Sequence, residues 1–319
     1  MSGCVQSKSS LIILFLTIFS SLIANAIPSY SRIDQDEEKT FQQTLIERNV
    51  AISKWFGNFT ESIDLFLVNR QHTADRNKTN VRIENSTYSI EGTGLTNETV
   101  LAINPRLPNL ERYWNLKFTT YDDQEDARGT DKSYLRQAPR QINYGATVGL
   151  FSKFGKVRTL FQPRIELQDP LNVSQTLAFE SVADFKTYKV IPKLEFFASA
   201  TKGTGIFQAI NFNILTSKLF SINLINEANY EEKLHRLSVT NGISVGHTIT
   251  PNDALTYNFY LFANNREHYH LDSYSLSVNW SHILIRKILD FQLTPHLDFN
   301  TGRDFRGQAG LTLQVILTF

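Results

Sequence analysis

From about residue 79 to the last residue, apolar and polar side chains alternate with a period of two in segments of ten or more residues. The last segment shows this pattern clearly: its polar positions are Thr312, Gln314 and Thr318, with Ile316 as an exception, and its apolar positions are Leu311, Leu313, Val315, Leu317 and Phe319. Successive side chains of a strand point to opposite faces, so the pattern predicts long strands with one apolar and one polar face.

Short sequences rich in Gly, Asn, Asp and Pro separate these segments and predict turns. We expect about fourteen strands, with twelve as the alternative, and the last eleven have the clearer alternation. The expected strands lie near residues 80-90, 96-106, 110-121, 141-151, 156-167, 173-185, 188-200, 205-215, 219-230, 235-248, 253-264, 269-281, 287-299 and 308-319. One connection is long, from Tyr121 to Gln141, and is rich in Asp, Arg, Gly and Gln.

Two architectures contain many consecutive strands, the soluble sandwich and the membrane barrel. Sandwich strands are typically ~5–6 residues long, whereas a tilted strand needs ~9–11 residues to cross a bilayer and carries aromatic residues near its ends. Aromatic residues do occupy the apolar parity near many segment ends, at Tyr144, Tyr188, Tyr230, Tyr274, Trp280, Phe291, Phe299 and Phe319. We therefore expect an all-β fold, a transmembrane antiparallel β-barrel over residues 79-319.

The first 26 residues have the pattern of a secretory signal peptide. Lys8 precedes an apolar run from Leu11 to Ile23, and the small residues of Ala24-Asn25-Ala26 suit a cleavage site. The run is shorter than the ~20 residues of a membrane-spanning helix. Cys4, the one cysteine of the chain, would be removed with this segment, so a disulfide or thiolate metal site is not expected.

Residues 27-70 are expected to contain an amphipathic helix from Glu37 to Leu67. Apolar residues recur there at steps of three, four and seven, with charged and amide residues on the opposite face. This segment would pack on the barrel, act as a plug in its lumen, or dock a periplasmic partner; these alternatives stay open. The expected apolar face consists of Phe41, Leu45, Ile52, Phe56, Phe59, Ile63 and Phe66.

The chain carries 32 Lys and Arg against 31 Asp and Glu, so a nucleic-acid partner is not expected. A catalytic pair of His235 and Ser238 is excluded because residues three apart on a strand face opposite sides. His268 and His270 share a face, but two histidines alone make at most a weak metal site. We expect neither an enzyme, nor a cofactor, nor a bound metal.

A proline, a basic residue, an aliphatic residue and an acidic residue follow one another in three expected strands, at 163-166, 192-195 and 295-298. Proline lacks the N–H that a ladder needs, so each strand requires a bulge or a position near its end. The charged pairs would face the lumen at similar height and form a constriction, or else simply neutralise one another. The candidate residues are Arg158, Arg164, Glu166, Glu180, Asp184, Lys189, Lys193, Glu195, Asp290, His296 and Asp298.

The signal-peptide pattern, the long alternating strands and the ending from Leu313 to Phe319 together resemble Gram-negative outer-membrane β-barrel proteins. The resemblance implies outer-membrane lipid around the barrel. An even number of strands would place the N-terminal helix and the C-terminus on one side, the periplasm. It also implies that Leu313, Val315, Leu317 and Phe319 act as the signal for the barrel-assembly machinery. The expected function is a passive pore for small polar solutes. The alternatives are an anchor for a periplasmic partner held by the helix, and then a lipid-modifying enzyme.

Overall fold

The computed structural model describes residues 41–68, 79–105, 114–130, 140, 143–167, 171–200, 203–217, 219–286 and 288–319. The signal-peptide prediction for residues 1-26 lies outside the described residues. Most of the described chain after residue 79 is strand, as the alternation predicts.

The strands are long and follow one another with short connections. Their bounds are β1 Asn80–Ile90, β2 Gly94–Asn104, β3 Trp114–Thr119, β4 Gly145–Phe154, β5 Val157–Glu166, β6 Asn172–Ser181, β7 Ala183–Asp184, β8 Tyr188–Ser199, β9 Gly203–Leu215, β10 Phe220–Glu231, β11 Arg236–Thr248, β12 Asp253–Asn264, β13 His270–Ile285, β14 Leu289–Asn300 and β15 Gln308–Thr318. Three helical segments accompany them, namely α2 Phe41–Val68, α3 Asp123–Asp126 and the 3-10 turn η1 Thr301–Arg303.

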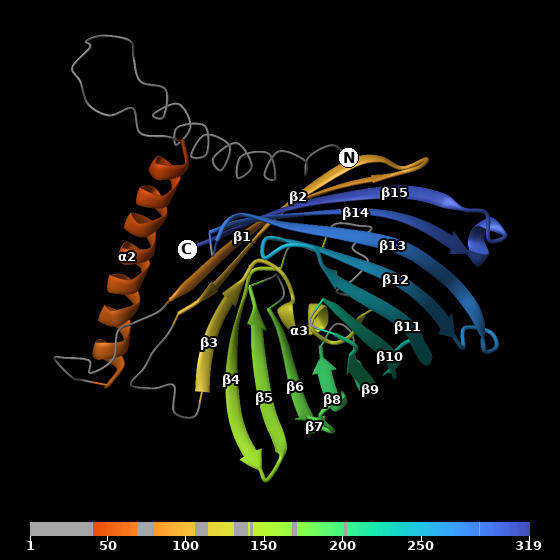
Figure 1. Ribbon diagram of the computed structural model, residues 1–319. Coiled ribbons are helices and arrows are strands. Elements are labelled where there is room, and N and C mark those ends of the chain that lie inside the picture. Colours follow the sequence, from red (N-terminus) through yellow and green to blue (C-terminus); the bar gives the residue numbers. More distant parts are fainter. Residues whose placement is uncertain are drawn as a thin grey trace, which may run out of the picture. The chain divides into compact units, whose positions relative to one another are not determined.

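The strands form one closed antiparallel sheet (Figure 1). β1 pairs with β15 along its length, and β6 pairs with β8, so the sheet closes on itself. β6 and β7 are one strand interrupted at Val182, and the barrel therefore has 14 strands. The first and last strands are joined through Val81 and Phe319, whose backbone groups exchange hydrogen bonds of 3.2 and 2.8 Å. The predicted fold class and strand number are confirmed.

The register assigns each parity to one face of the barrel. On β15 the outward positions Leu311, Leu313 and Val315 are 42%, 40% and 36% exposed. These residues lie opposite Pro295, Leu293 and Phe291 of β14, so the apolar face continues from strand to strand. The other parity points to the lumen and is mostly polar, which is the arrangement that a lipid-embedded barrel around a polar interior requires.

Aromatic side chains gather near both ends of the strands. At the end where the chain enters β8, β10 and β14, Tyr188 stacks on Phe185 at a ring distance of 4.9 Å, and Phe291 meets Trp280 edge to face at 5.0 Å. At the opposite end, Tyr274 stacks on Phe299 at 4.5 Å. Two aromatic belts are the arrangement that membrane interfaces favour.

Each of the three strand prolines faces outward and coincides with a break in one ladder, as its missing N–H requires. Next to Pro163 the β4–β5 register passes from Thr147↔Arg164 directly to Leu150↔Phe161. Pro192 lies opposite the interruption between β6 and β7. Beside Pro295 the β13–β14 register is broken in the same way. On their other sides the three prolines stay in register with β6, β9 and β15.

Helix α2 begins at Phe41, and the expected residues 37–40 lie outside the described part of the chain. The side chains of Phe41, Phe59, Ile63 and Phe66 also lie outside it, while those of Leu45, Ile52 and Phe56 are partly exposed. The helix exposes three large apolar side chains outside the predicted stripe, Ile46, Val50 and Trp55. Among the described residues, no helix combines the length and the hydropathy needed to cross a bilayer.

Candidate functional site

The long connection between β3 and β4 turns back against the inner wall of the barrel (Figure 1). Its described part contains the short helix α3, which begins after Asp122. The carboxylate of Asp122 accepts hydrogen bonds from the backbone N–H groups of Gln124 and Glu125 and so caps this helix. The partners of the connection all lie on the lumen-facing parity, which shows that it occupies the interior.

Arg164 of β5 holds the start of the connection. Its guanidinium is fully buried and contacts Asp123 at 3.2 Å and Glu166 at 3.3 Å. It also donates to the Thr119 hydroxyl at 2.7 Å and to the Asn143 carbonyl at 2.9 Å. One arginine thereby joins both ends of the connection to the barrel wall, and its charge is matched by two buried carboxylates.

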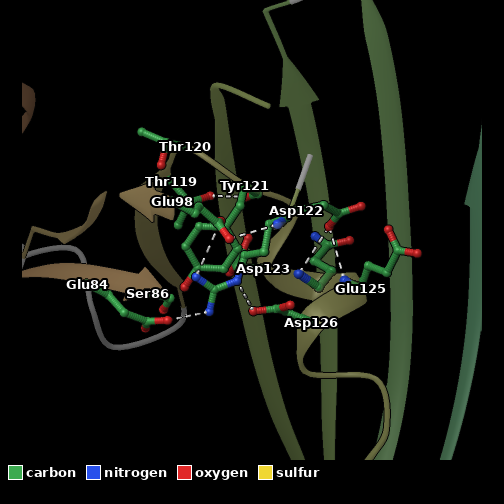
Figure 2. A network of polar contacts seen from close by, with 12 residues as sticks. Glu84, Ser86, Glu98, Thr119, Thr120, Tyr121, Asp122, Asp123, Glu125 and Asp126 are labelled. Atoms are coloured by element: carbon green, nitrogen blue, oxygen red, sulfur yellow. Dashed lines mark hydrogen bonds and ion pairs between the residues drawn. The ribbon is translucent and has the colours of Figure 1, made fainter. Parts of the chain in front are cut away.

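Arg140 makes a second attachment, on the β1–β2 side, where Figure 2 shows the carboxylates of Glu84, Glu98 and Asp126. Its guanidinium contacts Glu84 at 3.0 Å and Asp126 at 3.0 Å, and its backbone N–H donates to Glu98 at 2.8 Å. Burial lowers the pKa of Arg140, but the nearby carboxylates of Glu84 and Asp126 raise it by a larger amount. The pKa of Arg140 therefore lies above its ordinary value. Burial raises the pKa of Asp126 to about 6, against the opposing effect of Arg140.

A third attachment reaches across the lumen to β8 and β10. Arg128 binds Glu195 at 2.8 Å and lies 3.5 Å from the centre of the Phe197 ring. The backbone N–H and the hydroxyl of Thr130 both donate to Glu227, at 2.6 and 3.1 Å.

The residue between Arg128 and Thr130 is a glycine for a steric reason. A Cβ on Gly129 would approach the Phe207 ring to 2.8 Å and the Glu227 carboxylate to 3.0 Å. A cavity of about 20 Å³ remains beside it, lined in part by Asn229 and Thr240. Such a volume has room for one water molecule.

Helix α3 itself is attached through Gln124. Its side-chain amide donates to the Gln162 carbonyl of β5 at 2.9 Å and accepts from the Thr176 hydroxyl of β6 at 2.8 Å. The connection therefore has described contacts on β1, β2, β5, β6, β8 and β10. It crosses part of the lumen as a folded segment held on several sides.

The structure separates the predicted lumen residues into three groups. Arg164, Glu166, Lys193 and Glu195 meet at the connection, where Lys193 contacts Glu195 at 3.0 Å. Near the start of β5, Arg158 lies opposite Glu180, which in turn lies opposite Lys193 of β8. Lys189 binds Asp184 at 3.3 Å with both side chains exposed. The third group is Asp290, His296 and Asp298 on β14. The charges at the connection pair with one another, and a single band of charges at a common height stays a prediction.

Most of the residues that hold the connection were not among the sequence candidates. The missed residues are Glu84, Glu98, Asp123, Asp126, Arg128, Arg140 and Glu227. A signal was present, because charged residues are frequent in the one long connection between Tyr121 and Gln141. An alternation pattern could not identify the residues of the connection, since a connection has no fixed period.

The arrangement offers hydrogen-bonding and charged groups to the lumen. In the described parts of the chain, no three side chains of His, Cys, Asp or Glu gather as metal ligands would. His268 and His270 lie with their rings 5.3 Å apart on the outside of a turn. His235 has a left-handed backbone in the turn before β11, and Ser238 is on that strand.

No family model matches the chain, and no curated protein does. Among solved structures, a loop L8 deletion mutant of OmpT, an outer membrane protein of Vibrio cholerae, has a TM-score of 0.50 at 7% identity, covering 76% of this chain and 99% of that one. The outer membrane channel DcaP of Acinetobacter baumannii has a TM-score of 0.47 at 8% identity, covering 76% and 97%. The KdgM porin in complex with disordered oligogalacturonate has a TM-score of 0.36 at 8% identity, covering 75% and 99%. The first of these likenesses shows the fold, and the chain has the closed antiparallel barrel of Gram-negative outer-membrane proteins.

Proposed function

We propose that this chain is an outer-membrane pore through which small polar solutes diffuse. The observation that carries the proposal is the connection between β3 and β4, which is folded into the lumen and held there by three arginines. A barrel whose outer face is apolar and whose inner face is polar suits lipid on one side and water on the other. A folded segment inside such a lumen narrows the path and determines which solutes pass.

The charges of the lumen act mainly on the structure of the pore. Arg164, Arg140 and Arg128 each face carboxylates of the wall or of the connection at about hydrogen-bond distance. Opposite charges at this distance cancel much of each other's field. The pore would therefore discriminate between solutes more by size and hydrogen bonding than by net charge.

Planar-bilayer recording of the purified full-length protein tests the proposal. We expect stepwise ion conductance, and swelling of protein-containing liposomes in small neutral solutes. Heat-modifiable electrophoretic mobility shows whether the barrel is folded. A folded barrel that passes neither ions nor solutes, with residues 27-70 present or deleted, would contradict the pore function.

Location and orientation belong to the same proposal. The two aromatic belts and the apolar outer face support insertion in the outer membrane. With an even number of strands, the start of the first strand and the end of the last strand lie on the same side of the membrane, which we propose is the periplasm. The apolar outward positions of β15 ending at Phe319 suit recognition by the barrel-assembly machinery. Cysteine labelling in intact cells at the β4–β5 turn and at the β12–β13 turn would determine the orientation.

A second candidate function is an anchor for a periplasmic protein bound through α2. The exposed apolar side chains of Ile46 and Val50, 36% and 44% exposed, favour it. Recovery of a partner by the full chain but not by a chain lacking residues 27-70 would support this function, and equal recovery by both would exclude it.

A further inference from the structure

The lumen wall formed by β11 to β15 differs in chemistry from the wall that binds the connection. Its inward positions are mostly hydroxyl and amide residues, as in β13, where Ser273, Ser275, Ser277, Asn279 and Ser281 follow one another. The arginines that hold the connection bind carboxylates on β1, β5 and β8 instead. Around the carboxylate and imidazole pair of Asp298 and His296, this second wall therefore presents mostly hydroxyl and amide groups, while the charged Asp290 and Arg236 lie near the ends of their strands.

Four polar atoms that lie close together on this wall make no hydrogen bond to any residue that the structure describes. They are Asn258 Oδ1, Ser275 Oγ, His296 Nε2 and Asp298 Oδ1. The four residues are 4%, 2%, 6% and 7% exposed. Buried polar atoms normally have partners, and leaving one without a partner costs about 1–3 kcal/mol.

The four residues occupy neighbouring places in the sheet. Asn258 lies opposite Ser277, which lies opposite His296 on the next strand. Ser275 lies opposite Asp298 in the adjacent row. Since strands are about 4.8 Å apart, the set spans about 10 Å across three strands. That is one continuous patch of a size to contact a single small solute.

Contacts within the patch fix which hydrogen-bonding role each atom has left. The Nδ1 atom of His296 lies 2.6 Å from the Asp298 carboxylate. In the tautomer that donates from Nδ1 to this carboxylate, the Nε2 atom is left as an acceptor. The amide N–H₂ of Asn258 already donates to the Thr256 carbonyl and to Ser277, so only its oxygen is left. Three of the four atoms are therefore acceptors without donors.

The position of the imidazole depends on a glycine. A Cβ on Gly310 of β15 would lie 2.1 Å from His296 Cε1 and 2.4 Å from Nε2. The ring therefore lies over the backbone of the neighbouring strand, where any other residue would displace it. A glycine in a strand costs stability, and here it makes room for the histidine of the patch.

We propose that this patch of Asn258, Ser275, His296 and Asp298 is a binding site for a neutral polyhydroxylated solute, a sugar or a polyol. The inference rests on the proposed pore function and names the solute class. Hydroxyl groups supply the donors that three unpaired acceptors require, and each also accepts from Ser275. An uncharged ligand suits a patch whose neighbouring lumen-facing groups on β13 are serine hydroxyls and an asparagine amide.

Sugar-dependent block of the ion current tests the site in the full-length protein. Maltose is the probe, and we expect it to reduce the current of the wild type with a saturable dependence on concentration. The double variant Asn258→Ala with Ser275→Ala should weaken the apparent affinity about tenfold, the effect of two lost hydrogen bonds of ordinary strength. The matched control, Ser273→Ala with Ser281→Ala on β13, should leave the affinity unchanged.

The outcomes separate the site from the pore. Calorimetric titration of maltose into the detergent-solubilised protein measures binding without conductance, so a protein that binds but does not conduct would overturn only the pore. A conducting protein that maltose neither binds nor blocks would overturn the site alone. Equal weakening by both double variants would also overturn it. If spermidine blocks the current and maltose does not, the site binds a cationic amine, and the proposed class of neutral solutes is wrong.

Discussion

Arg164 is a single side chain on which the internal connection and the barrel wall both depend. It is fully buried and holds Asp123 and Glu166, which are 7% and 2% exposed. The first carboxylate also contacts Lys117 at 2.7 Å, and the second accepts from Asn172 at 2.6 Å. These secondary contacts compensate only part of the charge that a lost guanidinium would leave.

Replacing Arg164 with Met should therefore destabilise the folded protein by about 3–5 kcal/mol, as expected when one partner of a buried ion pair is removed. Urea-induced unfolding in detergent, followed by tryptophan fluorescence, measures the change. Arg158→Met is the control, because Arg158 is an exposed lumen arginine on the same strand and its loss should change stability by no more than about 0.5 kcal/mol. Equal effects of the two variants would contradict the role given to the buried network.

Asp126 introduces a pH dependence at the residue scale. Burial raises its pKa from 3.8 to about 6, against the effect of Arg140. Between about pH 4 and pH 6 the folded protein binds this proton and the unfolded chain does not. The contribution of Asp126 to stability is therefore largest below pH 4 and falls as the pH rises toward 6, by up to about 3 kcal/mol.

Comparison of the wild type with Asp126→Asn isolates this group from the other carboxylates. The stability of the wild type relative to the variant should fall as the pH is raised from 4 to 7, with most of the change below pH 6. Unfolding midpoints in urea at four pH values within this range measure it. A difference that stays constant, or that rises with pH, would show that the carboxylate is not buried in the folded protein.

The elements were predictable to the extent that a periodic pattern defines them. Each strand from β4 onward presents apolar residues to one side, and the turns between them are short. On β1 and β2 several outward-facing residues are polar. They bond one another across the two strands: Asn85 bonds Asn97 and Thr99, and Asn97 bonds Thr87. Both faces of these strands are polar at mid-length, which is why their alternation is weaker in the sequence.

The connection between β3 and β4 has no such period, and its inward fold depends on contacts between distant parts of the chain. Arg128 meets Glu195, which is 67 residues away, and Thr130 meets Glu227, which is 97 residues away. Single residue types do not specify such partners. The sequence therefore predicted that Glu195 faces the lumen, but it did not predict that Arg128 binds this carboxylate.

Loosening this connection should widen the pore without unfolding the barrel. In the variant Arg128→Ala, Glu195 keeps Lys193 as a partner at 3.0 Å, so the wall retains a paired carboxylate. We expect higher and noisier single-channel conductance than in the wild type, with unchanged heat-modifiable mobility. Arg236→Ala is the control, because Arg236 pairs with Glu231 near a strand end and has no described contact with the connection. Unchanged conductance in Arg128→Ala would mean that the connection does not limit the path.

The closure of the barrel is a property of the whole molecule and uses only residues from 80 to 319. β1 pairs with β15 over nine positions, from Arg82↔Thr318 to Ile90↔Gly310, and the ladder continues around to the β6–β8 pair. Each described strand has a neighbour on both sides, although β2 and β3 pair at only two positions. Alternation and strand number together were sufficient to predict this closure, since 14 strands of this length require it for their backbone groups to be paired.

Deleting residues 27-70 should therefore leave a folded barrel. We expect the shortened chain to refold in detergent with the same shift between heated and unheated electrophoretic mobility, and to unfold in urea within about 1 kcal/mol of the full chain, since the barrel ladder keeps all its hydrogen bonds. Conductance then separates two roles of the helical segment. Larger conductance after deletion would place it in the path of the solute, whereas unchanged conductance with loss of a bound periplasmic protein would make it a docking element. A chain that fails to fold without residues 27-70 would show instead that the helix stabilises the barrel, which the closed ladder does not require.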